Sequence, residues 1–189
     1  MSLDMLNIKL FELLNASANP NPILVKFAIF ISHDFVTILA IGLIALACLK
    51  PKRFKTLAIK AAVFTGTTSL IAAIIDKLYY HPRPFVLDLG HTLIHHGATN
   101  SFPSHHMLAM SSMALAFLLF SREKLVGGIC VALAWLVGWS RVYLGVHFPL
   151  DVMGAFLIAL FINILGNIIL YKYLEFRNLR QKAVVNLQV

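Results

Sequence analysis

Residues 150–173 read LDVMGAFLIALFINILGNIILYKY, a run in which Asp151 and Lys172 are the only charged side chains. A helix needs about 20 consecutive, mostly apolar residues to cross the hydrocarbon core of a bilayer. The run therefore predicts a membrane-spanning helix. The rest of the sequence is accordingly considered as that of a protein embedded in a lipid bilayer.

Three other apolar runs, at about 23–49, 56–80 and 102–120, reach or approach the same length, and a fifth at about 125–141 is shorter. The chain is 59% hydrophobic and 13% charged, whereas soluble domains are about 25% charged. We predict an all-α fold, a polytopic transmembrane helical bundle of about five spans. It forms one membrane-embedded domain over residues 1–189, with a transmembrane core at 23–173 and a cytoplasmic tail at 174–189.

The N-terminal segment 1–18 has a different pattern, with apolar and polar residues on opposite sides of a short helix. It is too short to span, so we predict an amphipathic helix lying in the membrane interface. A disordered leader is the alternative. The apolar side comprises Leu3, Leu6, Leu10, Phe11 and Leu14, and the polar side comprises Asp4, Asn7, Lys9 and Glu12.

The basic residues gather in the gaps between the apolar runs, within 50–55, 122–124 and 172–182. Cytoplasmic loops of membrane proteins carry an excess of Lys and Arg, so these three gaps are predicted to be cytoplasmic. The segments 81–101 and 141–149 then face outward. A net charge of +8 does not indicate a nucleic-acid partner, because that function requires a basic face with interleaved aromatic residues.

Seven of the eight histidines fall in or beside the predicted outer segments, which is difficult to explain by packing alone. We interpret them as marking a polar chamber at the outer surface. They are His81, His91, His95, His96, His105, His106 and His147.

The cluster richest in chemistry is Ser140-Arg141, followed by His147 and Asp151. Pro149 suits the first turn of a helix, where its missing N–H is not needed. A carboxylate four residues after His147 can then reach the imidazole and set its tautomer, which makes a competent nucleophile or base. The guanidinium of Arg141 suits phosphate oxygens.

Two further clusters stand at predicted outer helix ends. Ser104-His105-His106 opens the third apolar run, where free backbone N–H groups favour an anion and His106 is placed to protonate a leaving oxygen. Arg83 lies between two prolines at the end of the second run, so its backbone cannot continue a helix. Taken singly, each cluster also has an ordinary structural explanation, as a helix cap, an interfacial anchor or an ion pair.

Taken together, Arg83-Pro84, Pro103-Ser104-x-His106 and Ser140-Arg141 with His147 and Asp151 resemble the three-part signature of the type 2 phosphatidic acid phosphatase superfamily. The resemblance covers about residues 55–175. It implies that His147 attacks phosphorus to form a phosphohistidine and that Asp151 orients it. It also implies that His106 protonates the leaving group, that Arg83, Ser104 and Arg141 bind the phosphoryl oxygens, and that no metal or other cofactor is needed.

Two positions depart from the family pattern. Asp76 stands where the family usually has a phosphate-binding Lys, and the neighbouring Lys77 is a candidate substitute. His105 stands where Gly is commonest, and we expect it to contact a distal phosphate.

The outer segments also resemble the bacitracin-resistance type of undecaprenyl-diphosphatase. This implies a polyprenyl diphosphate lipid as substrate, a bacterial cytoplasmic membrane as location and a site facing the exterior or periplasm. His91, His95 and His96 are candidates for binding the second phosphate, or incidental rings of an interfacial loop. The alternatives are a phosphatase for phosphatidate or phosphatidylglycerol phosphate, a haloperoxidase, and a metal-binding transporter.

Overall fold

The computed structural model describes residues 2–49, 51–120 and 124–186, and every regular element within them is helical. The predicted all-α class is therefore confirmed. The elements are α1 (Leu3–Leu14), α2 (Pro22–Ser32), α3 (Asp34–Leu49), α4 (Pro51–Leu78), the short 3-10 helix η1 (Pro84–Leu87), α5 (His105–Phe120), α6 (Lys124–Tyr143) and α7 (Pro149–Asn186).

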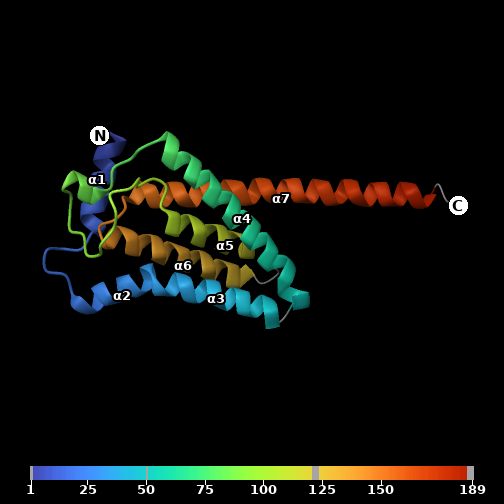
Figure 1. Ribbon diagram of the computed structural model, residues 1–189, viewed down its shortest axis with the longest axis horizontal. Coiled ribbons are helices and arrows are strands. Elements are labelled where there is room, and N and C mark those ends of the chain that lie inside the picture. Colours follow the sequence, from blue (N-terminus) through green and yellow to red (C-terminus); the bar gives the residue numbers. More distant parts are fainter. Residues whose placement is uncertain (1, 50, 121–123, 187–189) are drawn as a thin grey trace.

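Most of the long helices run roughly along one axis, α4 crosses them obliquely, and α1 lies across one end (Figure 1). Four helical stretches are long and apolar enough to cross a membrane: Pro22–Gly42, Lys55–Leu78, Lys124–Tyr143 and Pro149–Gln181. Their large apolar side chains are widely exposed, as lipid-facing side chains are in a bilayer. The chain is thus a multi-pass membrane protein.

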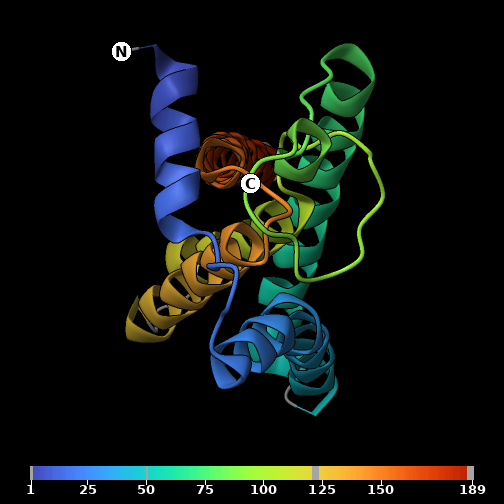
Figure 2. The ribbon, with the colours of Figure 1, turned by 90° about the vertical axis from the view of Figure 1, so that its left-hand side faces the viewer.

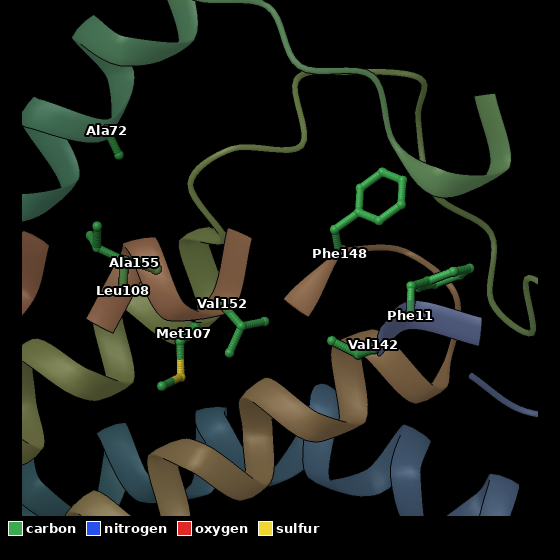
Figure 3. Close-up of a cluster of buried hydrophobic side chains, with 8 residues drawn as sticks. All are labelled: Phe11, Ala72, Met107, Leu108, Val142, Phe148, Val152 and Ala155. Carbon is green, nitrogen blue, oxygen red and sulfur yellow. The ribbon is translucent and has the colours of Figure 1, made fainter. Parts of the chain in front are cut away.

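The third predicted span, 102–120, is present as α5 but begins only at His105 and has 16 residues. At about 1.5 Å per residue, α5 is shorter than the four stretches that are long enough to cross a membrane. It packs against α4, α6 and α7, so protein rather than lipid surrounds it. Figure 3 shows part of this core, in which Met107 and Leu108 of α5 lie against Val152 and Ala155 of α7.

The first predicted span, 23–49, is interrupted. Helix α2 ends at Ser32, and His33 leaves helical geometry with φ −122° and ψ −65° before α3 begins at Asp34. The last helix is longer than predicted. Helix α7 continues through most of the predicted tail to Asn186 and extends beyond the bundle in Figure 1.

Helix α1 lies within the predicted segment 1–18, but its protein-facing side is not the one that the apolar pattern indicates. Asn7, assigned to the polar side, is buried beside Phe11, whereas Leu3, Leu6 and Leu14 are exposed. The side chain of Asn7 accepts a hydrogen bond from the backbone N–H of Leu150 at 3.0 Å. The first N–H groups of a helix have no partner within it, so α1 caps the start of α7.

The ends of the bundle differ in character. The α4–α5 loop, the α6–α7 turn and α1 gather at one end, seen face-on in Figure 2, while the start of α4 and the start of α6 lie at the other (Figure 1). The described parts of the basic gaps thus lie away from the histidine-rich segments. Lys50 and Arg122 fall outside the described residues.

The α5–α6 contact depends on a glycine. A Cβ on Gly127 would lie 2.5 Å from the Cα of Leu118, whereas a Cβ on the neighbouring Gly128 would meet nothing within 4 Å. We expect Gly127→Ala to destabilise the protein by about 1–3 kcal/mol because backbone must move. Gly128→Ala is the matched control, with the same gain in helix propensity. Thermal unfolding in detergent measures both, and equal midpoints would contradict this packing.

Candidate active site

Three chain segments meet at the end of the bundle shown in Figure 2: the 79–84 stretch after α4, the 99–106 stretch that enters α5, and the α6–α7 turn. They bring together the sequence-predicted residues Arg83, Ser104, Arg141, His147 and Asp151, all of which are buried. The two remaining candidates, His105 and His106, lie in the first turn of α5.

The start of α7 places the His147–Asp151 pair. Pro149 is the first helical residue, as predicted, and the Oδ2 of Asp151 accepts a hydrogen bond from the Phe148 backbone N–H at 2.8 Å. A carboxylate at the third helical position commonly caps its own helix in this way. The same Oδ2 lies 3.5 Å from the Nδ1 of His147, so the cap also holds the imidazole.

Arg83 lies on the other side of the imidazole. Its guanidinium donates to the carbonyl oxygens of Val146 at 2.8 Å, Asn100 at 2.7 Å and Thr99 at 3.1 Å. The same Nη1 that binds Val146 is 3.1 Å from the Nε2 of His147. Three backbone acceptors therefore fix this cation beside the ring nitrogen.

These contacts determine the tautomer of His147. A guanidinium only donates, so Nε2 must carry the lone pair and the ring proton belongs on Nδ1, toward Asp151. His147 is 2% exposed. Burial lowers its pKa to about 4, reinforced by Arg83 and Arg141 and opposed by Asp151. The imidazole is thus neutral at pH 7, with its unprotonated nitrogen next to a fixed cation.

The α6–α7 turn depends on Gly145, whose φ is +79°. A side chain would be strained there, and a Cβ would also collide with the backbone of His91. The turn is further held by the Leu93 N–H, which donates to the Leu144 carbonyl at 3.1 Å. Its close packing directs the Val146 carbonyl toward Arg83.

Ser104 and His106 stand at the entrance to α5. The hydroxyl of Ser104 is buried and has no hydrogen-bond partner among the described residues, so it is available to a ligand. His106 is half-buried and lies close enough to Arg141 for the two side chains to interact electrostatically. A free hydroxyl and an imidazole thus lie two residues apart where the chain enters α5.

Arg141 is buried, and its Nη1 donates to Ser32 Oγ at 2.6 Å, while its Nε has no partner among the described residues. Ser32 is the last residue of α2, just before the break at His33. The hydroxyl of the neighbouring Ser140 donates within its own helix, to Val137 O at 2.7 Å. Of these two, only Arg141 offers free donor capacity.

The two departures from the family pattern contact each other. The Nε2 of His105 lies 2.8 Å from the Oδ2 of Asp76, and the Asn100 amide donates to Oδ1 of Asp76 at 3.0 Å. Lys77 is exposed on the last turn of α4. Asp76 therefore orients the start of α5, and among the described residues Lys77 has no contact through which it would take the place of the family lysine.

Sequence reasoning missed several residues that build the site. Ser101 donates to the Oδ2 of Asp151 at 2.6 Å. Asn100 joins the two approaching segments, because its side chain accepts from the His81 N–H at 2.7 Å and donates to the Phe102 carbonyl at 2.7 Å. Their position just before Pro103 was the only sequence signal, since loop amides and hydroxyls carry no periodicity.

The three loop histidines differ in position. His91 and His95 are exposed, whereas the His96 ring lies edge-on to that of His147 at 6.4 Å between centroids. Burial lowers the pKa of His96. In the described part of the chain, no three His, Cys, Asp or Glu side chains gather as metal ligands would, so the transporter alternative lacks a ligand cluster there.

Comparison with known proteins agrees with this geometry. Residues 57–175 match the PAP2 superfamily. The chain is 37% identical over 155 residues to the putative undecaprenyl-diphosphatase YbjG of Escherichia coli, covering 82% of this chain and 78% of that protein. It is 30% identical over 164 residues to the undecaprenyl-diphosphatase BcrC of Bacillus subtilis, with coverage of 85% and 82%.

Among solved structures, LpxE of Aquifex aeolicus superposes with a TM-score of 0.70 at 28% identity, covering 85% of this chain and 93% of that one. The motifs at the end of the bundle, the match over most of the chain and the shared helical architecture lead to one conclusion. The chain belongs to the PAP2 superfamily and is a membrane lipid phosphatase.

Proposed function

We propose that this phosphatase hydrolyses undecaprenyl diphosphate to undecaprenyl phosphate and inorganic phosphate, through a phosphohistidine formed on His147. The observation that carries the proposal is the neutral imidazole held between Asp151 and Arg83. The substrate is supported by the names of the relatives from E. coli and B. subtilis. In this role the enzyme recycles the cell-wall lipid carrier and contributes to bacitracin resistance.

In the first step, the lone pair on Nε2 of His147 attacks the terminal phosphorus, and the bond from phosphorus to the bridging oxygen breaks. The ring becomes cationic, and the carboxylate of Asp151 balances that charge. Water then attacks the phosphohistidine, the N–P bond breaks, and inorganic phosphate leaves. His106 protonates the leaving oxygen in the first step and takes a proton from water in the second.

Arg83, Ser104 and Arg141 are proposed to bind the three non-bridging oxygens. Phosphoryl transfer needs positioning and charge stabilisation more than covalent assistance. Arg83 is already fixed by backbone carbonyls, while Ser104 Oγ and Arg141 Nε keep free hydrogen-bonding capacity within the described residues. Together these three residues form the proposed phosphoryl cradle. Arg83 Nη1 donates to Nε2 in the structure, so we propose that this N–H passes to a phosphoryl oxygen when Nε2 attacks phosphorus.

We propose that His105 and His96 flank this cradle and contact the second phosphate of the diphosphate, the one attached to the lipid. Asp76 and Asn100 hold the His105 ring in place, and His96 lies next to His147. The exposed His91 and His95 are placed less closely. A phosphatase for phosphatidate or phosphatidylglycerol phosphate remains the second candidate, because the same phosphoryl cradle would serve a monoester.

The site is proposed to face outward from the cytoplasmic membrane of a bacterium. The basic segments at the opposite end of the bundle support this orientation. The product phosphate would then be released to the periplasm or exterior.

The central test measures phosphate release from undecaprenyl diphosphate and from phosphatidate by purified protein in detergent, with a chelator present. We expect the diphosphate to be the better substrate and His147→Ala to abolish both activities. His33→Ala is the matched control, since His33 also pairs with an aspartate but is 81% exposed. Activity that survives in His147→Ala would overturn the mechanism, and loss of wild-type activity to the chelator would overturn the metal-independent reaction.

His106→Ala separates the two substrate classes. The leaving group of a diphosphate is itself a phosphate ester, far more acidic than the alcohol released from phosphatidate, so it depends less on a general acid. Loss of a general acid typically costs about 10²–10⁴-fold. We expect a loss in that range for phosphatidate and a smaller loss for undecaprenyl diphosphate, measured as kcat/KM, which reports the first step, the one in which the two leaving groups differ. Equal losses on both substrates would contradict the role of His106.

The Asp76–His105 pair is tested by a double-mutant cycle on kcat/KM with undecaprenyl diphosphate. We expect Asp76→Ala and His105→Ala each to lower kcat/KM several-fold. The double variant should have a kcat/KM no lower than that of the less active single variant, because the effects of residues that act as a unit are not additive. Lys77→Ala, on the neighbouring exposed residue, is expected to leave it unchanged. Multiplicative losses, or a larger loss from Lys77→Ala, would refute the pairing.

A further inference from the structure

The carboxylate of Asp151 is contacted by a second imidazole. Asp151 is 1% exposed, and its Oδ2 is occupied by Ser101 Oγ, the Phe148 N–H and the Nδ1 of His147. Its other oxygen, Oδ1, lies 3.2 Å from the Nδ1 of His81. Both atoms are buried, and neither has a hydrogen-bond partner among the described residues.

The His81 ring is held in place for this contact. It stacks on Tyr79 with 10° between planes and packs against Phe148 at 5.5 Å between centroids. Its backbone N–H is bound by Asn100, and its carbonyl accepts from the Ser101 N–H at 2.8 Å. A buried carboxylate oxygen without a hydrogen bond is unfavourable, and the only donor the described residues bring this close to Oδ1 is the Nδ1 of His81.

We propose that His81 is a positioning residue for the phosphatase site: its Nδ1–H donates to Oδ1 of Asp151 and so keeps Oδ2 directed at His147. The inference rests on the nucleophilic role proposed above for His147. His81 does not touch the phosphoryl cradle, so it acts on the chemical step through Asp151. Without it, Oδ1 has no donor and only Ser101 and the Phe148 N–H hold the carboxylate, so the partner that sets the tautomer of His147 is less firmly oriented.

The surroundings of His81 give this contact a pH dependence. It is faced by Asp151 at the start of α7, Asp4 of α1, the phenol of Tyr79 and the ring of Phe148. Asp151, with a smaller contribution from Asp4, raises the pKa of His81 above its ordinary value against the opposing effect of burial. The charge-assisted form of the bond is therefore complete at acidic pH and is lost as the pH rises through the raised pKa.

Two variants test whether His81 acts as a hydrogen-bond donor or only through the packing of its ring. His81→Phe keeps the ring and removes the donor, while His81→Asn puts an amide N–H at the position of Nδ1 and cannot ionise. We expect His81→Phe to lower kcat about tenfold or more with KM changed less than about threefold. We expect His81→Asn to recover most of kcat at neutral pH and to lack the alkaline decline that His81 imposes on the wild type. His33→Phe, on the exposed His–Asp pair, is the matched control and should behave as wild type.

The assay uses whichever lipid phosphate the wild type hydrolyses fastest, with thermal unfolding measured in parallel. A preference for phosphatidate would overturn the undecaprenyl diphosphate proposal and leave the His81 comparison readable. Wild-type kcat in His81→Phe would overturn the positioning role. So would equal losses in His81→Phe and His81→Asn, or an unchanged pH profile in His81→Asn.

Discussion

The buried carboxylate of Asp151 joins segments that are far apart in the chain. One oxygen caps the helix to which Asp151 belongs and also binds Ser101 and His147, and the other faces His81. A buried carboxylate is stable only when its oxygens are satisfied, so the 79–84 and 99–104 segments must converge on the start of α7. The same carboxylate therefore caps α7 and holds the segments of the site together.

The same requirement explains two irregular features of the bundle. Helix α5 is short because residues 99–104 are used as an extended strap that reaches Asp151 and Arg83. The strap can leave helical geometry at this depth because it is buried in protein, where loop and side-chain partners satisfy its backbone. Helix α1 contributes from outside the bundle, since Asn7 satisfies an N–H at the start of α7 that lipid could not.

The contact between Asp76 and His105 changes the meaning of two departures from the family pattern. Considered separately in the sequence, they indicated a missing phosphate-binding cation at position 76 and an added phosphate contact at position 105. In the structure they form one hydrogen-bonded pair that Asn100 also holds, so the two departures are linked through a direct contact. The proposed contact of His105 with the second phosphate of a diphosphate therefore depends on Asp76 as well.

The sequence by itself determined the helical class, the positions of most spans and the residues Arg83, Ser104, Arg141, His147 and Asp151 that meet in the site. Apolar run length, the cost of charge in lipid and the spacing along one helix turn are local properties, so they can be read along the chain. Tertiary structure decided the break at His33, the late start of α5 and the buried side of α1. Only the tertiary structure showed that His81, Asn100 and Ser101 contact Asp151 and Arg83. The partners of a buried polar group depend on proximity in space, and loop residues have no periodic pattern from which that proximity can be predicted.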